Sequence, residues 1–98
     1  VRMEDPLLDY VVAVADATRK AKAFKLGLSP RGALALCRAA RAYALVSGRD
    51  YCVPDDVKRM ATPVMAHRIL LDTNLYGLAR IAEAQSAVED ILRSVPAP

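Results

Sequence analysis

Proline recurs at the points where helices would begin, and this recurrence sets the framework of the chain. Asp5-Pro6 and Ser29-Pro30 each place a capping residue before a proline, and Pro54-Asp55-Asp56-Val57 opens a third segment. Asp and Ser favour the N-cap position, and proline suits the first turn because its missing N–H needs no partner there. The first two sites predict helices over residues 6–22 and 30–47.

Apolar residues recur along both segments at the spacing of one helical face. Gly27 is expected to turn the chain between the two helices in a left-handed conformation, and Gly48 to end the second helix. The stripes comprise Leu8, Val11, Val12 and Ala15 in the first helix, and Ala33, Leu36, Cys37, Ala40 and Ala44 in the second.

Pro54 begins a third helix, and the two acids that follow it suit the positive end of the helix dipole. Because proline disrupts a helix interior, Pro63 is expected to divide this region into a helix over 54–61 and a short one over 63–68. A last helix is predicted over 79–94. Its apolar stripe comprises Ile81, Ala84, Val88, Ile91 and Leu92.

Two short β-prone runs interrupt the helical pattern, at Tyr51–Val53 and Ile69–Leu71. They are expected to pair as a small ribbon, with a turn at residues 72–74. The predicted fold class is all-α, a small bundle of four to five helices with at most one two-stranded ribbon. The length of 98 residues limits the chain to a single domain, residues 1–98.

The cysteines and the apolar runs indicate in which cellular compartment the protein is expected to act. Cys37 and Cys52 match neither a metal-ligand spacing nor a disulfide framework, so we expect buried reduced thiols in a cytoplasmic protein. No apolar run follows a basic start, and none approaches the roughly 20 residues of a membrane span. The chain opens on Val1 rather than Met, as a fragment of a longer polypeptide would.

Positive charge is concentrated in one part of the chain. The net charge is only +3, but residues 17–49 contain no acid, and the remaining six bases and eleven acids give −5. A solvated face, a nucleic-acid surface, and a contact with a phosphate, a nucleotide or an acidic neighbour all remain open. Few aromatic residues interleave with the bases, so stacking on single strands is not supported. The eight bases are Arg19, Lys20, Lys22, Lys25, Arg31, Arg38, Arg41 and Arg49.

Recognisable catalytic machinery is absent from the sequence. The glycines stand singly, so neither a P-loop nor a G-x-G-x-x-G motif occurs. The single histidine, His67, is expected to be structural or at the surface, and Cys37 lies on an apolar helix face, so the two are not expected to form a catalytic pair. Asp55 and Asp56 are ascribed to helix-start electrostatics. We expect this chain alone to catalyse nothing.

Arg31 is the sharpest candidate for a binding residue. It follows Ser29-Pro30 and therefore lies in the first turn of the predicted second helix. Free N–H groups and the helix dipole favour anions at such a position, and a guanidinium makes forked, charge-assisted contacts with phosphate. The alternative is a surface arginine that happens to follow a cap.

Taken in order, several of these motifs resemble the lid of MoxR-type AAA+ ATPases. The resemblance is continuous over about residues 8–71 and looser in the tail, and magnesium-chelatase ATPase subunits share a similar arrangement. The matching runs are Tyr10-Val11-Val12, Ala17-Thr18-Arg19, Gly27-Leu28-Ser29-Pro30-Arg31-Gly32, Ala39-Ala40-Arg41-Ala42, Gly48-Arg49-Asp50-Tyr51, Pro54-Asp55-Asp56-Val57 and His67-Arg68-Ile69.

The resemblance implies a lid that closes over ATP and Mg bound to a P-loop core missing upstream. Arg31 would be the sensor 2 arginine of the Ser29-Pro30-Arg31 motif and would reach the terminal phosphates. The full-length protein would be a cytoplasmic ATPase that forms a ring, usually a hexamer. It would act as a chaperone-like remodeller, often beside a von Willebrand factor A domain protein.

Three positions depart from the usual pattern. Gly32 stands where Ala is common and is expected to loosen the helix start, Val53 replaces a Thr N-cap, and Ala66 replaces a frequent base. Two other functions stay open from the sequence. One is a free-standing helical nucleic-acid-binding module that uses the basic segment 19–49, which we favour less, and the other is a protein-interaction domain.

Overall fold

The computed structural model describes residues 1–66, 68, 70–71 and 76–98. It confirms an all-α bundle with one short ribbon, and its extents are 42 × 24 × 22 Å. None of the helices in these ranges is long and apolar enough to cross a bilayer. The elements are α1 (Asp5–Lys20), β1 (Phe24–Leu26), α2 (Pro30–Val46), α3 (Pro54–Met65), β2 (Leu70–Leu71) and α4 (Gly77–Ser94).

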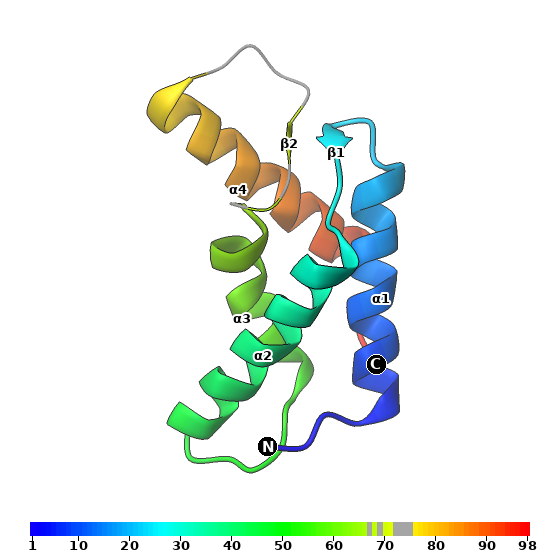
Figure 1. Ribbon diagram of the computed structural model, residues 1–98, viewed down its shortest axis with the longest axis vertical. Helices are drawn as coiled ribbons and strands as arrows, with labels where there is room; N and C mark the ends of the chain where they lie inside the picture. Colours follow the sequence, from blue (N-terminus) through cyan, green and yellow to red (C-terminus); the bar gives the residue numbers. More distant parts are fainter. Residues whose placement is uncertain (67, 69, 72–75) are drawn as a thin grey trace.

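One hydrophobic core joins the four helices. α3 returns alongside α2, α1 lies on the other side of α2, and α4 runs diagonally across the bundle toward α1 (Figure 1). Both cysteines are free and buried, as predicted, and burial raises the pKa of each thiol. The largest fully buried apolar side chains are Val11, Val14, Leu28, Leu36, Val57, Met65 and Val88.

The two ends of α2 follow the sequence prediction. Ser29 is the N-cap, and the helix ends at Val46, one residue before the predicted end, with Gly48 at a φ of 83°. The Arg49 amide donates to the Ala44 carbonyl at 2.9 Å, which closes the helix in the manner of a glycine C-cap. α1 differs slightly, because Glu4 rather than Asp5 occupies the N-cap position and the helix ends at Lys20.

The predicted break at Pro63 is wrong, because α3 continues through it to Met65. Proline removes one intrahelical hydrogen bond and costs about 3 kcal/mol in a helix interior. Val57, Ala61 and Met65 lie on the same face and are fully buried, and burial of the two larger side chains contributes about 1.5–3 kcal/mol each. Burial of this face outweighs the cost of the proline. His67, in the expected short helix, lies outside the described residues.

The ribbon forms between different partners from those predicted. β1 pairs antiparallel with β2, with Phe24 opposite Leu71 and Leu26 opposite Leu70. Tyr51 instead forms an isolated parallel bridge with Arg2, so the pairing of 51–53 with 69–71 is wrong. Short β-prone runs predict an extended backbone but not its partner. Ile69 and the expected turn at 72–74 lie outside the described residues.

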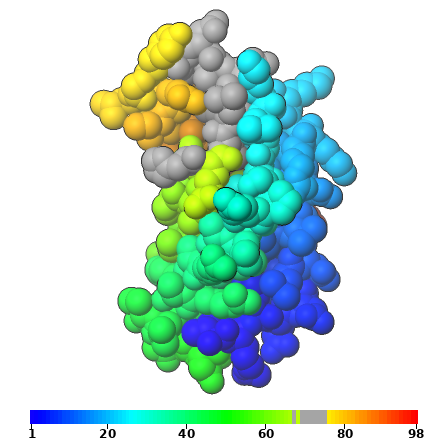
Figure 2. Space-filling model, viewed as in Figure 1, coloured from blue at the N-terminus to red at the C-terminus, as the bar shows by residue number. Residues whose placement is uncertain are grey.

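The bridge to Arg2 ties the amino-terminal segment to the α2–α3 loop. The Arg2 amide donates to the Asp50 carbonyl at 2.8 Å, and the Cys52 amide donates to the Arg2 carbonyl at 2.8 Å. In Figure 2 the first residues, in blue, lie against the green atoms of the α2–α3 region at the lower end of the molecule. The chain therefore enters α1 from a fixed position.

α4 begins at Gly77, two residues before the predicted start, and only part of its predicted stripe is in the core. Ala84, Val88 and Ile91 are buried, and Leu92 packs partly against them. Ile81, which was expected in the core, is 51% exposed. The first turns of α4 project past the bundle (Figure 1), in agreement with the exposure of this part of the stripe.

Candidate functional site

The amino-terminal end of α2 carries the candidate binding residue. The Ser29 hydroxyl oxygen accepts from the Gly32 amide at 3.1 Å, and the Ser29 carbonyl accepts from the Ala33 amide at 2.9 Å. Pro30 has no N–H to offer. Among the described residues, the Arg31 amide is therefore the one first-turn donor without an acceptor.

Arg31 itself is exposed and lies in the first turn of α2. Within the described part of the chain, its guanidinium makes neither a hydrogen bond nor an ion pair. The helix dipole and the guanidinium act in the same direction at this point, because both favour a negatively charged group. An exposed guanidinium and a free amide at the positive end of a helix are donors of the kind that bind phosphate groups.

The loop that leads into α2 is held by the last turn of α1. The Leu28 amide donates to the Thr18 hydroxyl oxygen at 2.9 Å, and the Thr18 hydroxyl donates to the Ala15 carbonyl at 2.6 Å. The Arg19 Nε donates to the Leu28 carbonyl at 3.2 Å. Both backbone polar groups of Leu28, three residues before Arg31, are thus bonded to α1.

Two glycines let this loop sit close to its neighbours. A Cβ at Gly27 would lie 2.7 Å from the Arg19 backbone N and 2.8 Å from the Thr18 carbonyl carbon. Its φ is not positive, so the expected left-handed turn is wrong, and close approach explains the glycine. A Cβ at Gly32 would lie 2.5 Å from Leu28 Cδ1, so Gly32 leaves room for the fully buried Leu28 side chain.

Ion pairing removes part of the basic character of residues 19–49. Arg19 pairs with Asp16 at 2.8 Å, which lowers the pKa of that carboxyl group, and Arg49 pairs with Asp56 at 2.6 Å. Arg38 is exposed and Arg41 half-buried, on the same side of α2 as Arg31. The surface formed by residues 19–49 is therefore less basic than its eight Lys and Arg residues alone indicate.

Asp56 is a residue whose role the sequence prediction missed. Asp55 is exposed at the start of α3, as helix-start electrostatics would require, but Asp56 is completely buried. It accepts two hydrogen bonds from Arg49 and one from the Val53 amide at 2.8 Å. The hydrogen bonds from Arg49, above all, hold the pKa of Asp56 below its usual value. The spacing from Val53 to Asp56 is that of a capping box, and it is the sequence signal from which this role could have been predicted.

This contact also explains how α3 begins without a capping side chain. Val53 has no oxygen to offer the first turn, and its side chain makes no cap bond. The Asp56 carboxylate supplies the other half of the capping box by accepting from the Val53 amide.

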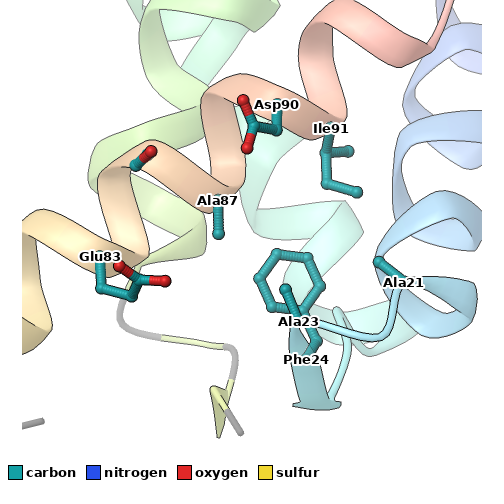
Figure 3. A pocket seen from close by; sticks show the side chains of 8 residues that line it. Ala21, Ala23, Phe24, Glu83, Ala87, Asp90 and Ile91 are labelled. Carbon is teal, nitrogen blue, oxygen red and sulfur yellow. The ribbon is translucent and has the colours of Figure 1, made fainter. Parts of the chain in front are cut away.

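A cleft of about 150 Å³ lies elsewhere, between α4 and the segment that joins α1 to β1. Figure 3 shows Phe24 and Ala87 at this cleft with the carboxylates of Glu83 and Asp90. Neither Arg31 nor its capping residues line it. The two carboxylates would repel a phosphate, so the lining of this cleft does not suit the phosphate groups of a nucleotide. Within the described residues, no group of three or more His, Cys, Asp or Glu side chains is placed to hold a metal ion.

Comparison with known proteins accounts for this architecture. Residues 16–93 match the AAA lid domain family. Chaperone MoxR1 of Mycobacterium tuberculosis is 37% identical over 94% of the chain and 26% of its own length. Protein MoxR of Methylorubrum extorquens is 40% identical over 74% of the chain and 21% of its own length. Protein YeaC of Bacillus subtilis is 37% identical over all of the chain and 30% of its own length.

A solved structure agrees with these relatives. A candidate ATPase from Cytophaga hutchinsonii superposes with a TM-score of 0.82 and 31% identity, over all of this chain and 32% of that one. The helical bundle and its capped α2 thus define an AAA lid domain, and the chain belongs to that family. It is similar to MoxR proteins over most of its length, which makes it a lid of the MoxR type. The chain spans less than a third of the length of the curated relatives it matches.

Proposed function

We propose that this lid closes over ATP held by a P-loop core that precedes it in the full-length protein, and that Arg31 is its sensor 2 residue. Ser29 and Pro30 set the start of α2 and so present Arg31 to the nucleotide. The guanidinium would bind the terminal phosphates and stabilise the charge that develops on the γ-phosphoryl group during hydrolysis.

The observation that supports this proposal is that Arg31 is exposed and has no ion-pair partner among the described residues. It is exposed at the positive end of a capped helix, and no described residue neutralises it. Arg19 and Arg49, in contrast, both have carboxylate partners. An arginine that is presented without a partner at a helix start is suited to an anion from outside the domain.

The wider setting of the lid belongs to the same proposal. The missing core would hold the P-loop and Mg, and neighbouring subunits would complete a ring, most simply a hexamer. MoxR1 is named a chaperone, which supports a role in protein remodelling, with a von Willebrand factor A domain protein as a partner. The free, buried thiols of Cys37 and Cys52 support action in the cytoplasm.

The structure does not favour a free-standing nucleic-acid module. Two of the eight bases in segment 19–49 are paired with acids, and the segment contains only two aromatic residues, Tyr43 and the buried Phe24. The sensor proposal needs only Arg31, which is among the bases that lack a described partner.

ATP turnover by the full-length protein tests the proposal. Arg31→Ala is expected to lower kcat/KM for ATP by about 10- to 100-fold, the loss typical of one hydrogen bond to a charged group. Arg38→Ala is the matched control, since Arg38 is also exposed on α2, two turns away. Equal turnover by the two variants would show that Arg31 is not a sensor.

A further inference from the structure

We infer that Thr18 and Arg19 are positioning residues for Arg31, and that α1 fixes through them the point at which the lid meets the nucleotide. This inference rests on the proposed sensor role. It adds two residues that do not touch the nucleotide but set where Arg31 stands.

The hydrogen bonds at Leu28 carry the inference. Thr18 is completely buried, and its hydroxyl proton is committed to the Ala15 carbonyl at 2.6 Å. Its lone pairs are then directed to the Leu28 amide at 2.9 Å. Arg19 binds the other backbone polar group of Leu28, because its Nε donates to the Leu28 carbonyl at 3.2 Å.

The surrounding packing leaves this arrangement little freedom. Leu28 is fully buried, and its Cδ1 occupies the space beside Gly32 where a Cβ would otherwise lie. Gly27 lies against the α1 backbone at Thr18 and Arg19, so closely that a Cβ would not fit. Three kinds of contact therefore hold the loop in place. The side chain of Leu28 is buried, the N–H and C=O groups of Leu28 are both hydrogen-bonded to α1, and the backbone of Gly27 lies against α1.

The position of the loop matters because the rate of a phosphoryl transfer depends steeply on where the groups that contact the phosphate lie. A displacement of about 1 Å in a catalytic contact can cost about 100-fold in rate. Leu28 is separated from Arg31 only by the cap and Pro30. A shift of the Leu28 backbone would move the start of α2 and carry Arg31 with it.

A double-mutant cycle in the full-length ATPase tests the inference. Thr18→Val keeps the shape of the side chain but removes the hydroxyl, and Thr18→Ser keeps the hydroxyl. Each is made with Arg31 present and with Arg31→Ala, and kcat/KM for ATP and the Tm are measured for all variants.

When Arg31 is present, we expect Thr18→Val to lower kcat/KM by about tenfold, which is the upper range for the loss of one buried hydrogen bond. With Arg31→Ala it should have less than about a twofold effect. Thr18→Ser should restore most of the activity.

Arg19 provides a second arm that does not depend on a buried substitution. Arg19→Met keeps most of the length of the side chain but removes the donor to the Leu28 carbonyl, at a side chain that is 42% exposed, so folding should be retained. Lys20→Met, at the adjacent exposed residue, is its control. Arg19→Met should lower turnover only where Arg31 is present, and Lys20→Met should not lower it.

The outcomes separate the two ideas. If Thr18→Val and Arg19→Met lower turnover by the same factor with and without Arg31, they act on stability alone and the inference is wrong. Full turnover in both variants also overturns it. If Arg31→Ala alone leaves turnover intact, the proposed function itself fails, whatever the variants at 18 and 19 do.

Discussion

Arg49 and Asp56 form a bidentate ion pair across the α2–α3 loop, with Nη2 to Oδ1 at 2.6 Å and Nη1 to Oδ2 at 2.7 Å. Arg49 also donates to the Tyr51 carbonyl at 3.2 Å and lies over the Tyr51 ring. Tyr51 bridges to Arg2. The pair therefore fixes both the start of α3 and the path by which the chain enters α1.

The two partners of this pair should not be equally important for stability. Arg49→Met leaves the fully buried Asp56 carboxylate without its cation, and unpairing a buried charge typically destabilises by about 3–5 kcal/mol. Asp56→Asn keeps an oxygen for the Val53 amide and leaves an arginine that can turn toward water, so it should cost less. Urea unfolding of the chain measures both variants. An equal or larger loss for Asp56→Asn would contradict the burial assigned to the carboxylate.

The same pair predicts how stability depends on pH. Hydrogen bonds from Arg49 lower the pKa of Asp56 in the folded state, so its contribution is fully present above the ordinary Asp pKa of about 3.9. It is lost as the pH falls below that value toward the folded pKa. The urea midpoint should therefore fall as the pH is lowered below about 4, and it should fall less steeply in Asp56→Asn. Parallel pH profiles for the two proteins would show that Asp56 is not the group responsible.

Gly27 should not tolerate a side chain. Its Cβ would meet the α1 backbone at 2.7–2.8 Å, and backbone atoms cannot turn away as a flexible side chain does. We expect Gly27→Ala to destabilise the chain by about 1–3 kcal/mol, as overpacking does. Lys25→Ala at an exposed neighbour should change stability by less than about 0.5 kcal/mol. An unchanged Tm for Gly27→Ala would show that the loop is not packed as described.

Tyr10 offers a substitution that should cost nothing. Its side chain is 3% exposed, and its hydroxyl has no hydrogen-bond partner among the described residues. Burial also raises its pKa. Removing an unpaired buried hydroxyl should leave stability unchanged or increase it by about 1–3 kcal/mol. Thermal unfolding of Tyr10→Phe, with the exposed Tyr76→Phe as control, checks this, and a clear loss of stability in Tyr10→Phe would indicate a partner for the hydroxyl.

Features set by local chemistry were predictable from the sequence. The start of α2 at Ser29 and Pro30 and its end near Gly48 need only the properties of those residues and their neighbours. The position of Arg31 in a first turn follows directly from the same signals. Local signals therefore suffice to locate the proposed nucleotide contact, whereas its role comes from the family resemblance.

Features set by distant partners were not predictable. Pro63 stays within α3 because burial of the opposite face outweighs one lost hydrogen bond. The burial of Asp56 depends on Arg49, which reaches it from the end of α2. Thr18 and Arg19 stood out in the sequence only as part of a motif, because their partner Leu28 is brought to them by the fold.

The affinity of the full-length protein for ATP, compared with its affinity for ADP, tests the central claim most directly. If Arg31 binds the terminal phosphates, Arg31→Ala should weaken ATP binding by about 10- to 100-fold, the worth of a charged hydrogen bond, and ADP binding far less. Equal weakening for both nucleotides, or none for either, would contradict a contact between Arg31 and the γ-phosphate.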